Sequence, residues 1–258
     1  MHRTLPLVLT LVATALPRPA LAQPDAAAPP TVAMSFWQCD RAAMDQLIEA
    51  EQTRSLPIYQ SLVDSGQMFE AGAMTHAWGD EWNFVLYVVA QDLAAAVAAN
   101  SAIQSAYAER WPDDNLLVES CTGHFDNIYT ARTGEGFTGA VSPDDPATVA
   151  LSFWQCPLHE VGRLMEEEGR GSAVIAQELT NEGLWRGSGF MTHAWGDVWN
   201  VVRYSAADDL PSLLTAFDAM GERMESRFPG MAATNVNATC SQHKDNIYDL
   251  VVRTTQGE

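Results

Sequence analysis

The feature that most constrains the fold of this 258-residue chain is an internal repeat. Three segments occur twice and in the same order: AMSFWQC at 33–39 returns as ALSFWQC at 150–156, MTHAWGDEWN at 74–83 as MTHAWGDVWN at 191–200, and CTGHFDNIY at 121–129 as CSQHKDNIY at 240–248. The first two pairs are 117 positions apart and the third pair 119. A repeat of this length predicts that one structural unit is built twice.

The repeat also predicts the domain boundaries. We expect one unit over residues 31–133 and a second over 147–254, joined by a linker at 134–146 whose Gly, Ser, Pro and Asp content is typical of loops. Residues 1–22 have the basic start, apolar run and A-x-A site of a signal peptide, and 23–30 form an exposed lead-in. We therefore expect an exported protein, periplasmic or secreted.

Charge excludes several classes of partner. With 33 acidic and 14 basic side chains, the formal net charge is −19. Nucleic acids and anionic lipid surfaces are bound through basic patches. We therefore expect neither nucleic acid nor membrane as a partner, and a small molecule as the ligand.

Each copy predicts the order strand, helix, strand, strand, helix, strand. In the first copy the strands are expected at 32–39, 68–78, 82–89 and 121–132, and the helices at 40–67, interrupted near Pro57, and at 91–111. The order βαββαβ is that of a ferredoxin-like unit, whose sheet has one face covered by helices and one bare face. Two fused units can cover each other's bare faces, which predicts an α+β barrel pseudo-dimer within one chain; further association stays open.

The chain resembles the dimeric α+β barrel superfamily, which includes antibiotic-biosynthesis monooxygenase, NIPSNAP-type and stress-responsive groups. The features that carry the resemblance are the βαββαβ order, the Leu56–Ile58 kink followed by Ser65–Gln67, and the Gly79–Asn83 turn with its counterpart at Gly196–Asn200. The resemblance implies a ligand cavity between sheet and helix or inside the barrel. The heme-degrading and quinone-oxidising residues of the family have no match in this sequence.

Each copy has two cysteines, and they stand at equivalent positions in the two copies. In a ferredoxin-like sheet the first and last strands are antiparallel neighbours, so the Cys that ends one lies beside the Cys that begins the other. This predicts two disulfides, Cys39–Cys121 and Cys156–Cys240, as suits an exported protein.

Four histidines and two aspartates recur in the copies. His124 and Asp126 share one face of a strand, as do His243 and Asp245, so each pair can act in acid–base catalysis. Should the second strand of one half lie near the last strand of the other, His76 would join His243 and Asp245, and His193 would join His124 and Asp126. Such sets could bind a divalent metal. The alternative is a structural role inherited by both copies.

The recurring Trp, Asn and Tyr residues are candidate ligand contacts: Trp78, Trp195, Asn83, Asn200, Tyr129 and Tyr248. The tryptophans could instead pair with Trp82 and Trp199 across their hairpins. The asparagines could bond the turn backbone, and the tyrosines could serve as packing.

Three functions remain open at this stage. The first is a cofactor-independent monooxygenase or isomerase acting on an aromatic or polyketide-like substrate, with the four recurring histidines as acid–base groups. The second is a non-catalytic protein that binds heme, a divalent metal or a small aromatic molecule. The third is a structural or stress-response protein without a small ligand, which a barrel filled by side chains would favour.

Overall fold

The computed structural model describes residues 29–133, 146–231 and 234–254. The expected signal peptide (1–22) and nearly all of the expected linker lie outside these residues. The first half of the chain contains β1 (Thr31–Cys39), η1 (Arg41–Ala43), α1 (Met44–Ala50), η2 (Glu51–Ser55), α2 (Leu56–Asp64), β2 (Glu70–Trp78), β3 (Phe84–Ala90), α3 (Leu93–Arg110), α4 (Leu116–Ser120) and β4 (Cys121–Ala131). The second half contains β5 (Ala147–Gln155), α5 (Val161–Arg170), α6 (Ser172–Asn181), β6 (Gly187–Trp195), β7 (Val201–Ala207), α7 (Leu210–Arg227), α8 (Val236–Thr239) and β8 (Gln242–Arg253).

The eight strands close into one antiparallel barrel in the order β1-β3-β2-β8-β5-β7-β6-β4. Each half contributes four adjacent strands, and the halves join through hydrogen-bonded pairs of β2 with β8 and of β4 with β6. The α+β class is therefore confirmed. The two sheets do more than pack face to face, because their edges pair and no strand edge is left open.

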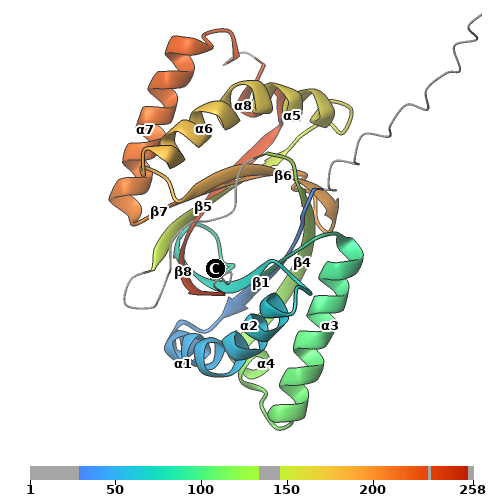
Figure 1. Cartoon of the computed structure of the whole chain (residues 1–258). Helices are drawn as coiled ribbons and strands as arrows, with labels where there is room; N and C mark the ends of the chain where they lie inside the picture. The colour runs from blue at the N-terminus through green and yellow to red at the C-terminus, as the bar shows by residue number, and fades with distance from the viewer. Residues whose placement is uncertain (1–28, 134–145, 232–233, 255–258) are drawn as a thin grey trace, which may run out of the picture.

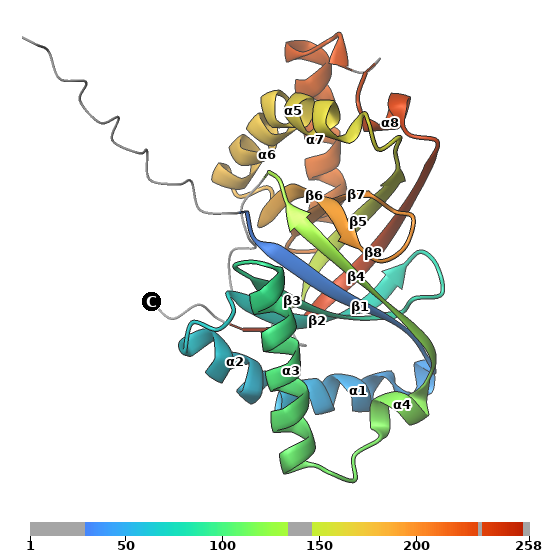
Figure 2. The ribbon, with the colours of Figure 1, turned by 90° about the vertical axis from the view of Figure 1, so that its right-hand side faces the viewer.

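The helices lie outside the barrel, those of the first half on one side and those of the second half on the other (Figure 1). The view turned by 90° shows the strands running between these two helical layers (Figure 2). None of the helices in the described part of the chain is long and apolar enough to cross a membrane.

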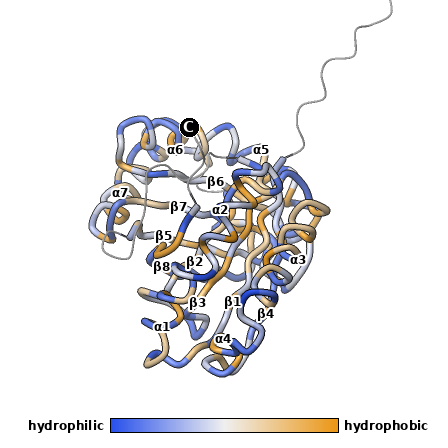
Figure 3. Tube along the Cα trace, turned by 60° about the horizontal axis from the view of Figure 1, so that its bottom comes forward, coloured by the Kyte–Doolittle hydropathy of each residue, from blue (hydrophilic) through white to orange (hydrophobic). Residues whose placement is uncertain are grey.

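The barrel interior is filled by side chains from both halves. Alternate residues of β1 point inward, namely Val32, Met34 and Phe36, and they pack against inward residues of β5 such as Leu151 and Phe153. Long hydrophobic segments follow the strands, while the helices alternate in hydropathy (Figure 3). The alternation follows from the period of two along a strand.

Both expected disulfides are present, Cys39–Cys121 and Cys156–Cys240. Beside each one, an asparagine that begins or precedes a strand binds the cysteine backbone. Asn83 accepts a hydrogen bond from the Cys39 N–H at 2.8 Å and donates one to its carbonyl at 2.8 Å. Asn200 does the same with Cys156, at 2.8 and 2.7 Å. These amides hold the end of the first strand of each half in place.

Two local expectations are corrected. The first helix is interrupted at Glu51–Ser55, one turn earlier than expected, by a π-helical turn, and Pro57 sits at the start of α2 where its missing N–H costs nothing. Trp82 does not pair with Trp78 across the hairpin. It packs edge-on against Phe125 of β4, with ring centroids 4.6 Å apart, whereas Trp78 remains 62% exposed.

Candidate functional site

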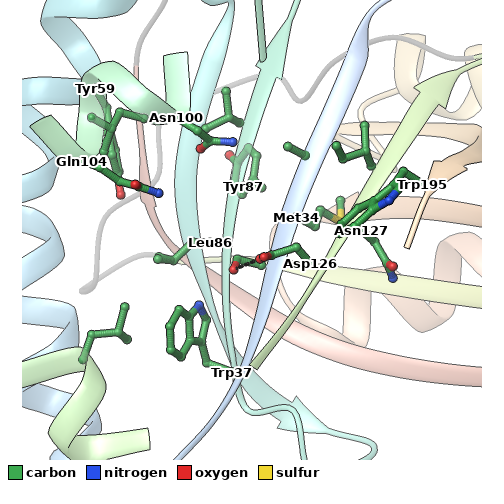
Figure 4. Close-up of a pocket in the computed structure, with 16 residues that line it drawn as sticks. Met34, Trp37, Tyr59, Leu86, Tyr87, Asn100, Gln104, Asp126, Asn127 and Trp195 are labelled. Carbon is green, nitrogen blue, oxygen red and sulfur yellow. Dashed lines mark hydrogen bonds between the residues drawn. The ribbon is translucent and has the colours of Figure 1, made fainter. Parts of the chain in front are cut away.

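A cavity of about 360 Å³ lies in the first half, between the outer face of the barrel and helices α2 and α3. Figure 4 shows Tyr59, Asn100 and Gln104 on the helix side, facing Trp37, Leu86 and Asp126 on the strand side. The volume falls in the range of roughly 300–1,000 Å³ that is usual for small-molecule sites. A residue of the second half, Trp195, completes the lining because it pairs with Ile128 where β6 joins β4.

Two polar groups of β1 mark the strand side of the cavity. The Ser35 hydroxyl donates a hydrogen bond to the Asp126 carboxylate on the neighbouring strand β4. The indole Nε1 of Trp37 is buried and has no hydrogen-bond partner among the described residues. A buried donor without a partner costs about 1–3 kcal/mol.

A buried carboxylic acid lies behind the helix side. The Tyr59 hydroxyl donates to Glu51 at 2.8 Å, and Glu51 sits in the π-helical turn that interrupts the first helix. Burial raises the pKa of Glu51 to about 7, and hydrogen bonds from Tyr59 and Ser55 only partly oppose it. We did not single out Glu51 from the sequence. The signal was available, because Glu51 and Ser55 recur 117 positions later as Glu168 and Ser172.

Larger side chains stand at three equivalent positions of the second half. Leu86 is replaced by Arg203, Asn100 by Phe217, and Met68 by Trp185. The Arg203 guanidinium lies 5.0 Å from the Trp185 ring centre and 5.7 Å from that of Phe217. Burial lowers the pKa of Arg203 to about 10, and the Glu168 carboxylate partly offsets this. The two halves therefore differ where their outer layers would hold a ligand.

His124 and His243 occupy equivalent places on the outer face of the barrel. Each ring stacks on the tryptophan of the neighbouring first strand: His124 on Trp37 with centroids 4.3 Å apart, and His243 on Trp154 at 4.8 Å. His124 Nε2 lies 3.9 Å from Asp126, and His243 Nε2 lies 3.0 Å from Asp245. Both expected His–Asp pairs therefore face the same side of their strands, and the first pair borders the cavity through Asp126.

His76 and His193 lie elsewhere. The expected neighbourhood of strands is present, but the register places His76 opposite Tyr248 and His193 opposite Tyr129, not beside His243 or His124. Each of these tyrosines is five positions along the strand from the histidine, His243 or His124. Within the described ranges, no three His, Cys, Asp or Glu side chains are placed to hold a metal ion. The expected His–His–Asp metal sets are therefore not assembled, because strand register separates their members.

Tyr129 and Tyr248 are fully buried and fasten the seam between the halves. Asn246 donates to the Tyr248 hydroxyl at 3.1 Å and accepts from the Asp80 N–H in the β2–β3 turn at 3.2 Å. The seam on the other side repeats the arrangement with Asn127, Tyr129 and the Asp197 N–H. A Cβ at either turn glycine, Gly79 or Gly196, would clash with the asparagine oxygen, and both have positive φ.

Comparison with known proteins shows a likeness in structure only. No family model matches the chain, and no curated protein matches it in sequence. A "putative monooxygenase" from Lactobacillus acidophilus NCFM superposes with a TM-score of 0.60 at 8% identity, over 89% of this chain and 97% of that one. A second "putative monooxygenase", from Fusobacterium nucleatum, gives 0.59 at 10% identity, over 89% and 96%. An anthrone oxidase-like protein gives 0.52 at 17% identity, over 89% and 94%. The chain shares their fold.

The likeness covers most of this chain and nearly all of the first two proteins. The described part of this chain and nearly the full length of each of these proteins therefore follow one architecture, an α+β barrel. At such low identity the likeness is one of fold alone. The chemistry of the site has to be argued from the residues of this chain.

Proposed function

We propose that this protein is exported and binds one small aromatic molecule per chain, in the cavity between β1, β3, β4 and helices α2 and α3. The observation that carries the proposal is the cavity of about 360 Å³ in the first half, together with the larger side chains Arg203, Phe217 and Trp185 that stand near the equivalent place in the second half and pack against one another. The two disulfides support export, because such bonds persist in oxidising compartments.

The lining supports an aromatic ligand with a hydrogen-bonding substituent. Trp37 and Leu86 supply apolar area, and the Asn100 and Gln104 amides supply polar groups around it. Mostly apolar walls with a few placed polar groups are typical of small-molecule sites. The barrel interior, by contrast, is filled, which favours a purely structural role for that part of the molecule.

The proposal is tested by transferring the second half's side chain into the first. Titration calorimetry with the neutral probes anthrone and 1-naphthylmethanol is expected to show binding to the unaltered protein. Asn100→Phe is expected to weaken it at least 30-fold, because the ring occupies the cavity as Phe217 does in the second half. The reciprocal variant Phe217→Asn is the matched control and should leave the affinity unchanged. Absence of binding to the unaltered protein, or equal binding to Asn100→Phe, would overturn the proposal.

A second candidate is cofactor-independent oxygenation of the bound molecule. The Ser35–Asp126 hydrogen bond and the adjacent His124 offer an acid–base group at the cavity wall. The fold neighbours described as monooxygenases and as anthrone oxidase-like add support. The test reaction is anthrone with O₂, giving anthraquinone and water. Asp126→Asn is expected to retain binding of anthrone and to lose at least 100-fold in rate; an unchanged rate would exclude Asp126.

We further propose that the two halves arose by tandem duplication of a ferredoxin-like unit, so that the monomer is a pseudo-dimer with units at 31–133 and 147–254. The repeated segments and the shared strand order support this. The heme alternative has less support in the cavity. No His or Cys is among its described lining residues, and the Tyr59 hydroxyl is engaged by Glu51.

A further inference from the structure

We infer that the cavity selects positively charged aromatic molecules, such as aryl-alkyl amines, over neutral and anionic molecules of the same shape. This inference rests on the proposed function and adds the chemical class of the ligand. Its basis is the charge and ring content of the cavity wall.

The wall carries negative charge and no described positive charge. Asp126, one of the lining residues, contributes a carboxylate on the strand side, and its side chain is about half exposed. Among the sixteen described lining residues there is no Lys, Arg or His. The His124 ring is a neighbouring basic group: its Nε2 is 3.9 Å from Asp126, and the ring stacks on Trp37 without being among the lining residues.

Aromatic faces surround the same space. Trp37, Tyr59 and Trp195 line the cavity from three different elements, β1, α2 and β6. An ammonium group over such rings is attracted by their electron-rich faces, by about 0.5–2 kcal/mol depending on solvent access. The second half shows the same preference internally, because the Arg203 cation occupies the equivalent space among Trp185, Phe190 and Phe217.

The whole molecule adds a field of the same sign. The formal net charge of −19 attracts cations to the surface and repels anions. An anionic ligand would therefore face repulsion on approach and at Asp126, with no guanidinium or ammonium in the described wall to receive it. A cation would face attraction at both stages.

The experiment compares three probes of similar shape by titration calorimetry at pH 7.5 and low salt: 1-naphthylmethylamine as the cation, 1-naphthylmethanol as the neutral molecule, and 1-naphthoate as the anion. We expect the amine to bind about tenfold tighter than the alcohol, and the carboxylate to bind at least tenfold more weakly than the alcohol. Asp126→Asn should bring the amine and the alcohol to within twofold.

Asp245→Asn is the matched control, because Asp245 is the counterpart of Asp126 in the half whose space is filled. It should leave the tenfold preference intact. His124→Gln should preserve or increase the preference of the cavity for the amine, since it removes a basic side chain that lies beside Asp126. Equal binding of amine and alcohol, or tighter binding of the carboxylate, would overturn the inference while the pocket itself stands. Binding of none of the three would overturn the proposed function as well.

Discussion

The two halves of this protein have the same strand order and equivalent disulfides, but they differ in the side chains beneath their long helices; those of the first half line a cavity of about 360 Å³. Helix α3 packs over strand β3. In the first half β3 carries Leu86 and α3 carries Asn100, whereas the equivalent positions of the second half hold Arg203 and Phe217. The backbone framework is therefore shared, and the choice of a few side chains decides whether a ligand space exists.

The two halves also differ in how they bond the indole N–H of an equivalent tryptophan, Trp37 or Trp154. In the second half the Trp154 indole N–H donates to the Asn237 side chain at 2.8 Å. The counterpart of Asn237 is Val118, which cannot accept, and the equivalent Trp37 N–H is buried without a partner in the described chain. The Trp154 N–H is therefore satisfied within the second half, whereas the Trp37 N–H of the first half is not satisfied by any described residue. The bond also makes Asn237, whose sequence context matches a glycosylation site, part of the packing.

The largest expected effect tests what the halves share. Each disulfide closes a loop of similar length, with sequence separations of 82 and 84. Replacing Cys39 and Cys121 by Ser, or Cys156 and Cys240 by Ser, is expected to lower the free energy of unfolding by about 4 kcal/mol in each case. Urea unfolding monitored by tryptophan fluorescence measures both. A difference of more than 2 kcal/mol between the two variants would show that the halves are not equally dependent on their staples.

The next effect separates the halves through their buried glutamates. The pKa of Glu51 is raised to about 7 from an unfolded value near 4.5, so the folded protein holds this proton more tightly than the unfolded chain. Stability from this group is complete below pH 4.5 and is lost as the pH rises through 7. Glu51→Gln is therefore expected to stabilise the protein by about 3 kcal/mol at pH 8 and by little at pH 5.

Glu168→Gln is the matched variant in the second half. Burial raises the pKa of Glu168 as well, but the Arg203 cation opposes the shift. The substitution removes the carboxylate that offsets the burial of Arg203, so a smaller stabilisation, or a loss, is expected at pH 8. Urea unfolding at pH 5 and pH 8 provides the readout. Equal gains for both variants would remove the electrostatic distinction between the halves.

The smallest effect concerns the two seams. Tyr248 accepts a hydrogen bond from Asn246 and donates one to the Trp82 carbonyl at 3.1 Å, whereas Tyr129 accepts from Asn127 at 2.8 Å. Tyr248→Phe is expected to lower the free energy of unfolding by about 2 kcal/mol and Tyr129→Phe by about 1 kcal/mol. The first variant leaves two buried groups unpaired and the second leaves one, at about 1 kcal/mol each. The urea midpoints of the two variants measure this difference in stability. A larger loss at Tyr129 would reverse the expected ranking of the seams.

Much of the fold could be predicted from local sequence pattern. The expected first strand at 32–39 matches β1 at 31–39, and the helix expected at 91–111 matches α3 at 93–110. The short helix α4 was missed, because five residues give too little periodicity to detect. The interruption of the first helix was expected near Pro57 but lies at Glu51–Ser55, because a proline is tolerated in the first turn of a helix.

The candidate site was predicted only in fragments. Asp126 and Trp195 were expected as site residues and line the cavity, whereas Ser35, Tyr59 and Asn100 were not singled out. The expected meeting of His76 with His243 fails because adjacent strands can pair in many registers, and the sequence pattern fixes the face of a residue but not its partner across the sheet.

The repeat in the sequence predicted the α+β class and the two disulfides, and the alternation along each strand predicted which residues face inward. These features follow from the spacing of residues within each unit and from the similarity of the two copies. Only the tertiary structure decided the register at the seams, the burial of Glu51 and the open space in one half. Those depend on contacts between residues far apart in the chain, where one side chain more or less changes how much volume is left unfilled.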